Sequence, residues 1–180
     1  MIAEPERLIK EFRSAVASWR IECPQIEHFL VHPPHSNAEM RKILRDDCFL
    51  VYTFSMPSTA DVLKVGVAGP KSDARVLSMH YRPNSAPSNL AKQLLASPEE
   101  HARLGAEGLT VENVGDWIRQ HTDRDFFRMP TSERDLALMF ESYLRLRRGA
   151  LFENFSGKAT LAAAGGLPDF LSSGTTFSGR

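Results

Sequence analysis

Long apolar runs are missing from this sequence, cysteine is scarce and the charges cancel. No stretch approaches the roughly 18 apolar residues of a membrane-spanning helix, and several charged residues fall within the first 20 positions. Neither a membrane span nor a signal peptide is therefore expected. The two cysteines, Cys23 and Cys48, lack the spacing of metal ligands. Reduced thiols and a cytoplasmic location are the simplest interpretation.

The absence of net charge argues against a general nucleic-acid-binding protein. The chain carries 22 basic and 22 acidic residues, whereas proteins that live on DNA usually have a basic surplus, because binding releases counterions from phosphates. Residues 62–103 have a local surplus of bases over acids. The bases there are Lys64, Lys71, Arg75, Arg82, Lys92 and Arg103, against Asp73, Glu99 and Glu100. A catalytic groove could be basic here while the rest of the protein is neutral, but composition alone does not indicate nucleic acid.

The first 48 residues predict helices. Apolar side chains recur at helical spacing over residues 5–20, and Pro5 suits the first turn of a helix. Residues 23–36 contain Pro33-Pro34 and are expected to form an irregular connection. Ser36 and Glu39 have the spacing of a capping box, which predicts a second helix running to about Asp46.

The remaining chain predicts a hairpin followed by helices and one more strand. Residues 49–54 and 62–67 are β-rich runs separated by a polar loop, which is typical of a hairpin. Helical patterns follow at 70–77, 89–95 and 111–121, a short strand at 125–129, and a capped amphipathic helix from Thr131 or Ser132.

This order of elements predicts an α+β fold. We expect a small, mostly antiparallel, three-stranded sheet flanked by helices. The chain then divides into an N-terminal helical extension (1–48), a core (49–154) and a tail rich in Gly, Ser and Ala (155–180).

The chemically informative residues are Tyr52, the triplet Lys64-Val65-Gly66, Arg75 and Glu141, in that order. Here the sequence resembles the GIY-YIG nuclease superfamily. In that family a tyrosine on the first hairpin strand precedes a Tyr-or-Lys, aliphatic, Gly triplet on the second, an arginine on the next helix and a glutamate on a later one. The first triplet, Leu50-Val51-Tyr52, departs from the pattern by lacking a glycine. Lysine at position 64 is a variant that some restriction endonucleases share.

The resemblance implies a GIY-YIG-like core and an endonuclease that hydrolyses DNA phosphodiester bonds with Mg²⁺ or Mn²⁺. A restriction or defence enzyme that pairs as a homodimer would fit it. Glu141 would be the metal ligand. The catalytic residues would be Tyr52, Lys64, Arg75, His80 and Glu141. The substrate-binding residues would be Gly66, Tyr81 and Asn154. These roles follow from the same resemblance or from the expected closeness of the residues to the groove.

Elementary chemistry assigns compatible roles. A lysine ammonium close to a phenol lowers the phenol pKa, so Lys64 would help Tyr52 act as general base toward water; His80 is the alternative base. The fork of donors on Arg75 would contact phosphate. One carboxylate, Glu141, with several waters suits Mg²⁺. We therefore expect Tyr52, Lys64, Arg75 and Glu141 to converge on one open concavity.

Each residue also has a plain structural interpretation. Tyr52 can be a core aromatic, Lys64 the solvent face of a strand, Arg75 a solvated helix residue, and Glu141 the partner of Arg145 one turn on.

An alternative function is therefore a catalytically inactive module that binds nucleic acid or protein through Phe126, Phe127 and the tail. An enzyme acting on small nucleotides is a third. A zinc site at His28, His32 and His35 is disfavoured, since two prolines interrupt it and no cysteine joins it.

Overall fold

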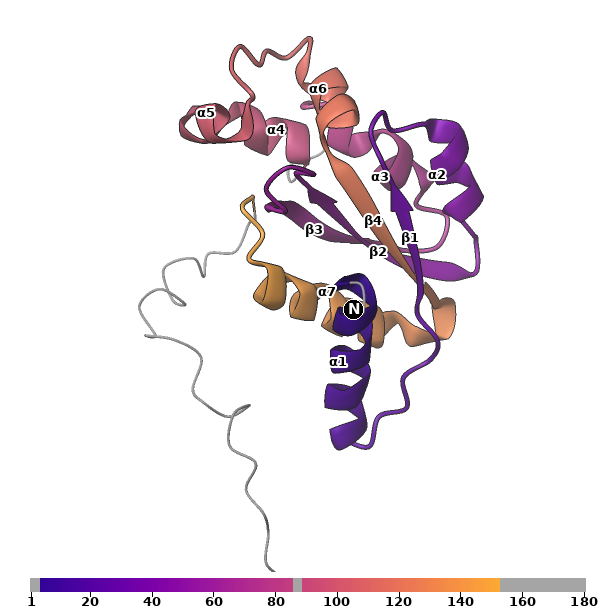
Figure 1. Ribbon diagram of the computed structural model, residues 1–180. Coiled ribbons are helices and arrows are strands. Elements are labelled where there is room, and N and C mark those ends of the chain that lie inside the picture. The colour runs from indigo at the N-terminus through magenta and orange to yellow at the C-terminus, as the bar shows by residue number, and fades with distance from the viewer. Residues whose placement is uncertain (1–3, 86–88, 153–180) are drawn as a thin grey trace, which may run out of the picture.

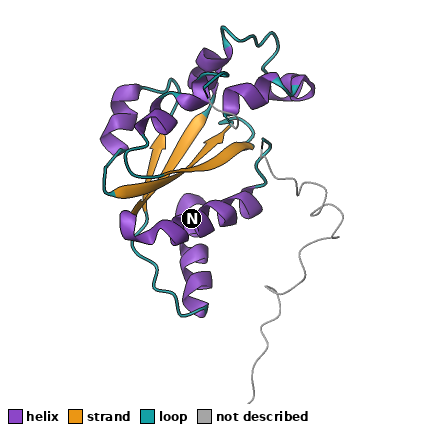
Figure 2. Ribbon diagram, turned by 180° about the vertical axis from the view of Figure 1, so that it is seen from behind, coloured by secondary structure: helices purple, strands orange, loops and turns teal. Residues whose placement is uncertain are grey.

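The computed structural model describes residues 4–85 and 89–152, which form one antiparallel sheet with helices on both faces (Figures 1 and 2). The strands run in the order β1-β4-β2-β3. Their bounds are Glu27–Val31 for β1, Cys48–Ser55 for β2, Val62–Ala68 for β3 and Asp123–Pro130 for β4. The expected α+β class and the β2–β3 hairpin are confirmed, but the expectation of three strands is wrong.

The additional strand, β1, lies in the segment for which only helices and an irregular connection were expected. It pairs along its whole length with β4, from Glu27 opposite Arg128 to Val31 opposite Arg124. Only Val31 is fully buried, and Leu30 is exposed. An edge strand of five residues carries too weak an alternation of apolar and polar residues to be recognised. The N-terminal segment thus contributes a strand to the same sheet as the expected core.

One face of the sheet is covered by α2 and by the helices between β3 and β4, which lie above it in Figure 1. Tyr52 and Phe54 of β2 and Phe126 of β4 point into this layer, where they pack with Val76 and Leu90. The elements that follow one another here are α2 (Asn37–Ile43), α3 (Asp73–Leu77), the 3₁₀ turn η1 (Met79–Tyr81), α4 (Leu90–Leu95), the 3₁₀ turn η2 (Pro98–Glu100), α5 (His101–Leu104) and α6 (Val114–His121).

The opposite face is covered by α1 (Glu4–Ser18) and α7 (Arg134–Arg148), with the 3₁₀ turn η3 (Thr131–Glu133) leading into α7. Phe140 of α7 packs on Phe12 of α1 and on Phe127 of β4, with ring centroids 4.8 and 5.2 Å apart. The apolar stripe of α7 therefore faces the sheet, and that of α1 packs on α7. In the part of the chain that the structure describes, no helix has the length and apolar content needed to cross a membrane.

A buried polar network fastens this second layer to the strands. Asp125 Oδ2 accepts hydrogen bonds from Thr53 Oγ1 (2.8 Å) and from an Arg148 guanidinium nitrogen (3.0 Å), and Oδ1 lies 2.8 Å from His28 Nε2. His32 pairs with Asp123 and His35 with Tyr81. The three histidines considered for zinc thus each contact a different protein group.

Candidate active site

The phenol of Tyr52 is the centre of the candidate site. Tyr52 lies in the middle of β2, directly opposite Gly66 of β3. An added Cβ on Gly66 would lie 2.5 Å from the Tyr52 hydroxyl oxygen, so the ring extends over the glycine. Glycine at position 66 is therefore required for the packing of this tyrosine, a role that needs no contact with substrate.

His80 of η1 fixes the phenol, and its own tautomer can be deduced. The Leu90 backbone N–H donates to His80 Nδ1 at 3.3 Å, and His80 Nε2 lies 2.6 Å from Tyr52 Oη. Burial, reinforced by neighbouring cations, holds the pKa of His80 well below its ordinary value, so the ring is neutral at physiological pH. Because Nδ1 accepts, the single ring proton is on Nε2, which donates to the phenol oxygen.

Several charges act on the phenol from different elements. Burial is the largest effect, and the pKa of Tyr52 is raised overall. Arg75 of α3 opposes this rise by charge and by hydrogen bonding and Arg124 of β4 by charge, whereas Glu141 of α7 adds to it. The structure therefore brings Arg75, His80 and Glu141 within electrostatic or hydrogen-bonding range of Tyr52, as the sequence predicted. Arg124 joins them without having been predicted.

Lys64 is buried beside the site but does not act on Tyr52 as expected. It lies opposite Phe54 in the strand register, and its Nζ donates to Gln93 Oε1 at 2.9 Å and to the Phe152 carbonyl at 3.4 Å. Its charge contributes to lowering the pKa of His80, whereas the cations that lower the pKa of Tyr52 are arginines. The interpretation of Lys64 as a solvent-facing lysine is also wrong, because only 5% of it is exposed.

Glu141 approaches from the opposite layer. It lies on α7, is buried, and accepts a hydrogen bond from Arg145 at 2.7 Å, the pairing that the plain interpretation of this residue predicted. Among residues 4–85 and 89–152, no group of three or more His, Cys, Asp or Glu side chains could hold a metal ion. The expected metal site has a single protein carboxylate, so it would not form such a group.

The expectation of an open concavity is wrong for most of these residues. Tyr52 is 1% exposed, His80 3% and Glu141 9%, and only Arg75 is exposed. Apolar residues of the sheet and of the helical layer that covers this face enclose the phenol, as the core interpretation of Tyr52 predicted. Of the expected residues, His80 and Arg75 reach the Tyr52 hydroxyl in the interior of the fold, whereas Lys64 hydrogen-bonds elsewhere and Glu141 acts on Tyr52 only by charge, from the helix that covers the opposite face of the sheet.

The residues expected to bind substrate do not share one site. Tyr81 is buried, with its hydroxyl 3.0 Å from His35 Nδ1 and 3.2 Å from an Arg124 nitrogen, and so belongs to the interior. Asn154 lies outside the described residues. Two polar residues that sequence reasoning missed, Gln93 and Arg124, contact the site. The place of Arg124 two residues before Phe126, on the same face of an expected strand, was the available signal for the second.

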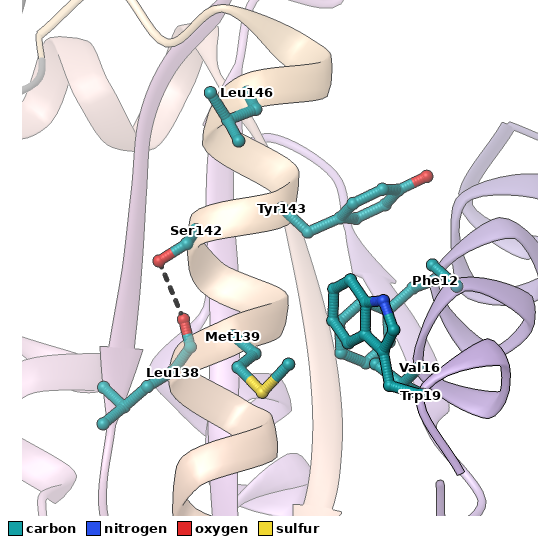
Figure 3. Close-up of a pocket in the computed structure, with 9 residues that line it drawn as sticks. Phe12, Val16, Trp19, Leu138, Met139, Ser142, Tyr143 and Leu146 are labelled. Atoms are coloured by element: carbon teal, nitrogen blue, oxygen red, sulfur yellow. Dashed lines mark hydrogen bonds between the residues drawn. The ribbon is translucent and has the colours of Figure 1, made fainter. Parts of the chain in front are cut away.

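A separate apolar groove lies in the other layer, between α1 and α7 (Figure 3). Its volume is about 410 Å³, and Phe12, Val16 and Trp19 face Met139 and Tyr143 across it. None of its lining residues belongs to the Tyr52 site, and its apolar walls offer no catalytic group. The groove therefore does not compete with Tyr52 as a candidate for chemistry.

Comparison with known proteins finds no relative of this chain. No family model matches the chain, and no curated protein or solved structure matches it. The arrangement of side chains around Tyr52 is therefore the basis for assigning a function.

Proposed function

We propose that the chain is a metal-dependent endonuclease of the GIY-YIG type, which hydrolyses DNA phosphodiester bonds with Tyr52 as general base. The observation that carries the proposal is the surroundings of the Tyr52 hydroxyl. His80 Nε2 lies 2.6 Å from it, and Arg75 and Glu141 act on it from two further elements. Arg75 and Glu141 are residues that the resemblance implied, and they come from distant parts of the sequence; Lys64, which it also implied, hydrogen-bonds elsewhere.

The hydrogen-bonding pattern favours Tyr52 over His80 as the base. His80 has its proton on the nitrogen that faces Tyr52, and its other nitrogen accepts from Leu90 N–H. Neither nitrogen is placed to take a proton from water. The phenol oxygen instead receives donors, which favour a phenolate, although burial outweighs them and the pKa of Tyr52 is raised overall. A phenolate at this position can accept the proton of an attacking water.

The remaining residues suit the other requirements of phosphodiester hydrolysis. Arg75 is the exposed member of the group, and its guanidinium can donate two parallel hydrogen bonds to a phosphate. Glu141 is an oxygen ligand of the kind that Mg²⁺ or Mn²⁺ prefers, and would have to share its carboxylate with Arg145. A bound ion would neutralise charge on the phosphate and the leaving oxygen.

Plasmid nicking tests the proposal. Purified protein is incubated with supercoiled plasmid and Mg²⁺ or Mn²⁺, with an EDTA control and with Tyr52→Phe as a matched variant that keeps the ring. Metal-dependent nicking by the wild type and its loss in the variant are expected. Equal nicking by both proteins would exclude Tyr52 as the base. Size-exclusion chromatography with light scattering on the same samples tests whether the chain pairs as a homodimer.

Burial of the phenol favours a second candidate, a binding module without catalysis. A core in which Tyr52 is 1% exposed gives a phosphate no direct path to the phenol, and the zero net charge offers no strong attraction to DNA. Gel shifts with no metal-dependent nicking would select this candidate. Nicking that requires Tyr52 would reject it.

A further inference from the structure

Arg124 is the most completely buried charged residue of the described chain. It lies on the central strand β4, opposite Phe54 of β2 and two positions before Phe126, which pairs with Tyr52. Its exposed fraction is 0%. The side chain therefore sits on the same face of the sheet as the Tyr52 phenol.

Aromatic rings surround the guanidinium. Its carbon lies 4.3 Å from the ring centroid of Phe54, 4.6 Å from that of Phe126 and 5.0 Å from that of Tyr52. One terminal nitrogen donates to the Val76 carbonyl and to the Tyr81 hydroxyl. Nε and the other terminal nitrogen have no hydrogen-bond partner among the described residues. No ion pair joins Arg124 to a carboxylate within residues 4–85 and 89–152.

Packing alone gives no reason for this arginine. A buried cation without a carboxylate loses its hydration and gains little in return, and an apolar side chain of similar volume is often equally or more stabilising. The rings offset part of this loss through their negative faces. A charge held at such a position acts mainly on its neighbours, which include the Tyr81 hydroxyl, 3.2 Å from a guanidinium nitrogen, and the Tyr52 phenol, over whose ring the guanidinium lies.

We propose that Arg124 is a positioning residue of the Tyr52 site, and that its fixed charge, held under the ring, favours the phenolate that takes the proton from water. This inference depends on the proposed function for its chemical purpose. The geometry that carries it is the stack of Arg124 on Tyr52 and Phe54 together with the two nitrogens that lack partners. Arg124 would act through Tyr52 and would not touch the substrate.

The other charges around Tyr52 define what Arg124 adds. Lys64 of β3, Arg75 of α3, neutral His80 of η1 and Glu141 of α7 approach from the elements packed against it. Arg75 is exposed and therefore screened by solvent. Arg124 is enclosed, so its charge is screened least. Arg75 and, after it, Arg124 lower the pKa of Tyr52 against the larger effect of burial, which raises it overall, and Arg124 also lowers the pKa of His80, so the imidazole stays neutral.

The test reads tyrosine ionisation directly. The chain has three tyrosines, Tyr52, Tyr81 and Tyr143, so NMR of protein labelled at tyrosine Cζ gives three signals, assigned by single Tyr→Phe variants. In Arg124→Met the Tyr52 titration is expected to move to higher pH by at least about one unit. The matched control is Arg119→Met, because Arg119 stacks on Tyr81, 3.8 Å from its centroid, and not on Tyr52. This control should leave the Tyr52 titration unchanged.

The pH profile of nicking gives a second readout that simple loss of packing would not produce. The limb of the pH profile that reports the general base should move to higher pH in Arg124→Met. Arg124→Lys keeps the charge, so it should restore most of the wild-type profile. If Arg124→Met does not fold, Arg124→Gln replaces it in both measurements. A folded neutral variant with an unchanged Tyr52 titration overturns the inference.

The two proposals fail separately. An active wild type whose Tyr52 titration ignores Arg124 rejects the role of Arg124 and leaves the nuclease standing. A protein without nicking activity, in which Arg124→Met still shifts the Tyr52 titration, rejects the nuclease and supports the coupling between Arg124 and the phenol.

Discussion

Gly66 and Tyr52 face each other across β2 and β3, and a Cβ on the glycine would lie 2.5 Å from the tyrosine oxygen and 2.6 Å from its Cζ. Real Cβ atoms essentially never approach other atoms so closely. The ring has little room to move, because Tyr52 is enclosed and its oxygen is held by His80. The position of the candidate base therefore depends on the missing side chain of its neighbour.

Gly66→Ala should destabilise the protein by about 1–3 kcal/mol through overpacking. The displaced phenol should also lose the hydrogen bond with His80, and nicking should fall with it. Gly69→Ala is the control, since its Cβ would meet Phe49 at 3.3 Å, a contact that a small shift relieves. Thermal unfolding and nicking assays on both variants make the comparison. Equal melting temperatures for the two would contradict the geometry.

A second prediction concerns acid stability and Asp125. Burial alone would raise the pKa of this carboxyl, but hydrogen bonds from His28 and Thr53 and the charge of Arg148 outweigh it, and the pKa is lowered overall. The folded state therefore binds the proton less readily than the unfolded state. The stabilisation is fully present above the pKa of the unfolded chain, and is lost as the pH falls through the lowered value.

Asp125→Asn should accordingly lower the melting temperature at neutral pH and flatten its decline in acid. Breaking the buried pair should cost about 3 kcal/mol, the low end of the usual range, because Arg148 keeps its pairing with Glu4. Asp123→Asn, on the same strand but paired with the exposed His32, should change little. Parallel acid-stability curves for wild type and Asp125→Asn would show that the network does not carry this pH dependence.

The elements that the sequence predicted best are those with a strong apolar period. Both α1 and α7 have continuous stripes, and the two strands of the β2–β3 hairpin are dense in apolar and β-branched residues. Strand β1 was missed because half of it faces solvent and prolines flank it. Its formation depends on β4, nearly 100 residues later, and local pattern carries no trace of such a partner.

Burial of charge was the other failure of sequence reasoning. Arg124 lies between Asp123 and Asp125, a charged run that is typical of a solvated segment. Its burial results from aromatic rings contributed by β2 and η1. Lys64 alternates with apolar neighbours and suggested a solvent face, yet α4 and the chain after α7 cover it. The residue types of the candidate site were predictable, whereas their enclosure is a property of the assembled layers.

Lys64→Met should act on His80. Loss of the ammonium removes one of the cations that lower the pKa of the imidazole, so this pKa should rise toward its ordinary value. Histidine NMR titration measures the change directly, with Lys92→Met as a control on α4. The Tyr52 titration should move less than in Arg124→Met. If Lys64→Met shifts Tyr52 more than His80, the assignment of its target is wrong.

The last prediction separates binding from catalysis at Glu141. Glu141→Gln keeps an oxygen that can accept from Arg145, so folding should survive. The variant loses the charged ligand that would hold the metal, so nicking should fall by orders of magnitude. DNA affinity should stay the same or increase, because a negative charge near the phosphates is gone. Asp135→Asn, on the exposed face of the same helix, should cut as the wild type does.

Arg75→Ala should weaken both binding and turnover, since the guanidinium meets phosphate in the ground state too. Gel shifts and nicking assays on the three variants decide the matter. If Glu141→Gln cuts as fast as wild type, the metal assignment is wrong, and Glu153, outside the described residues, is the next carboxylate to replace.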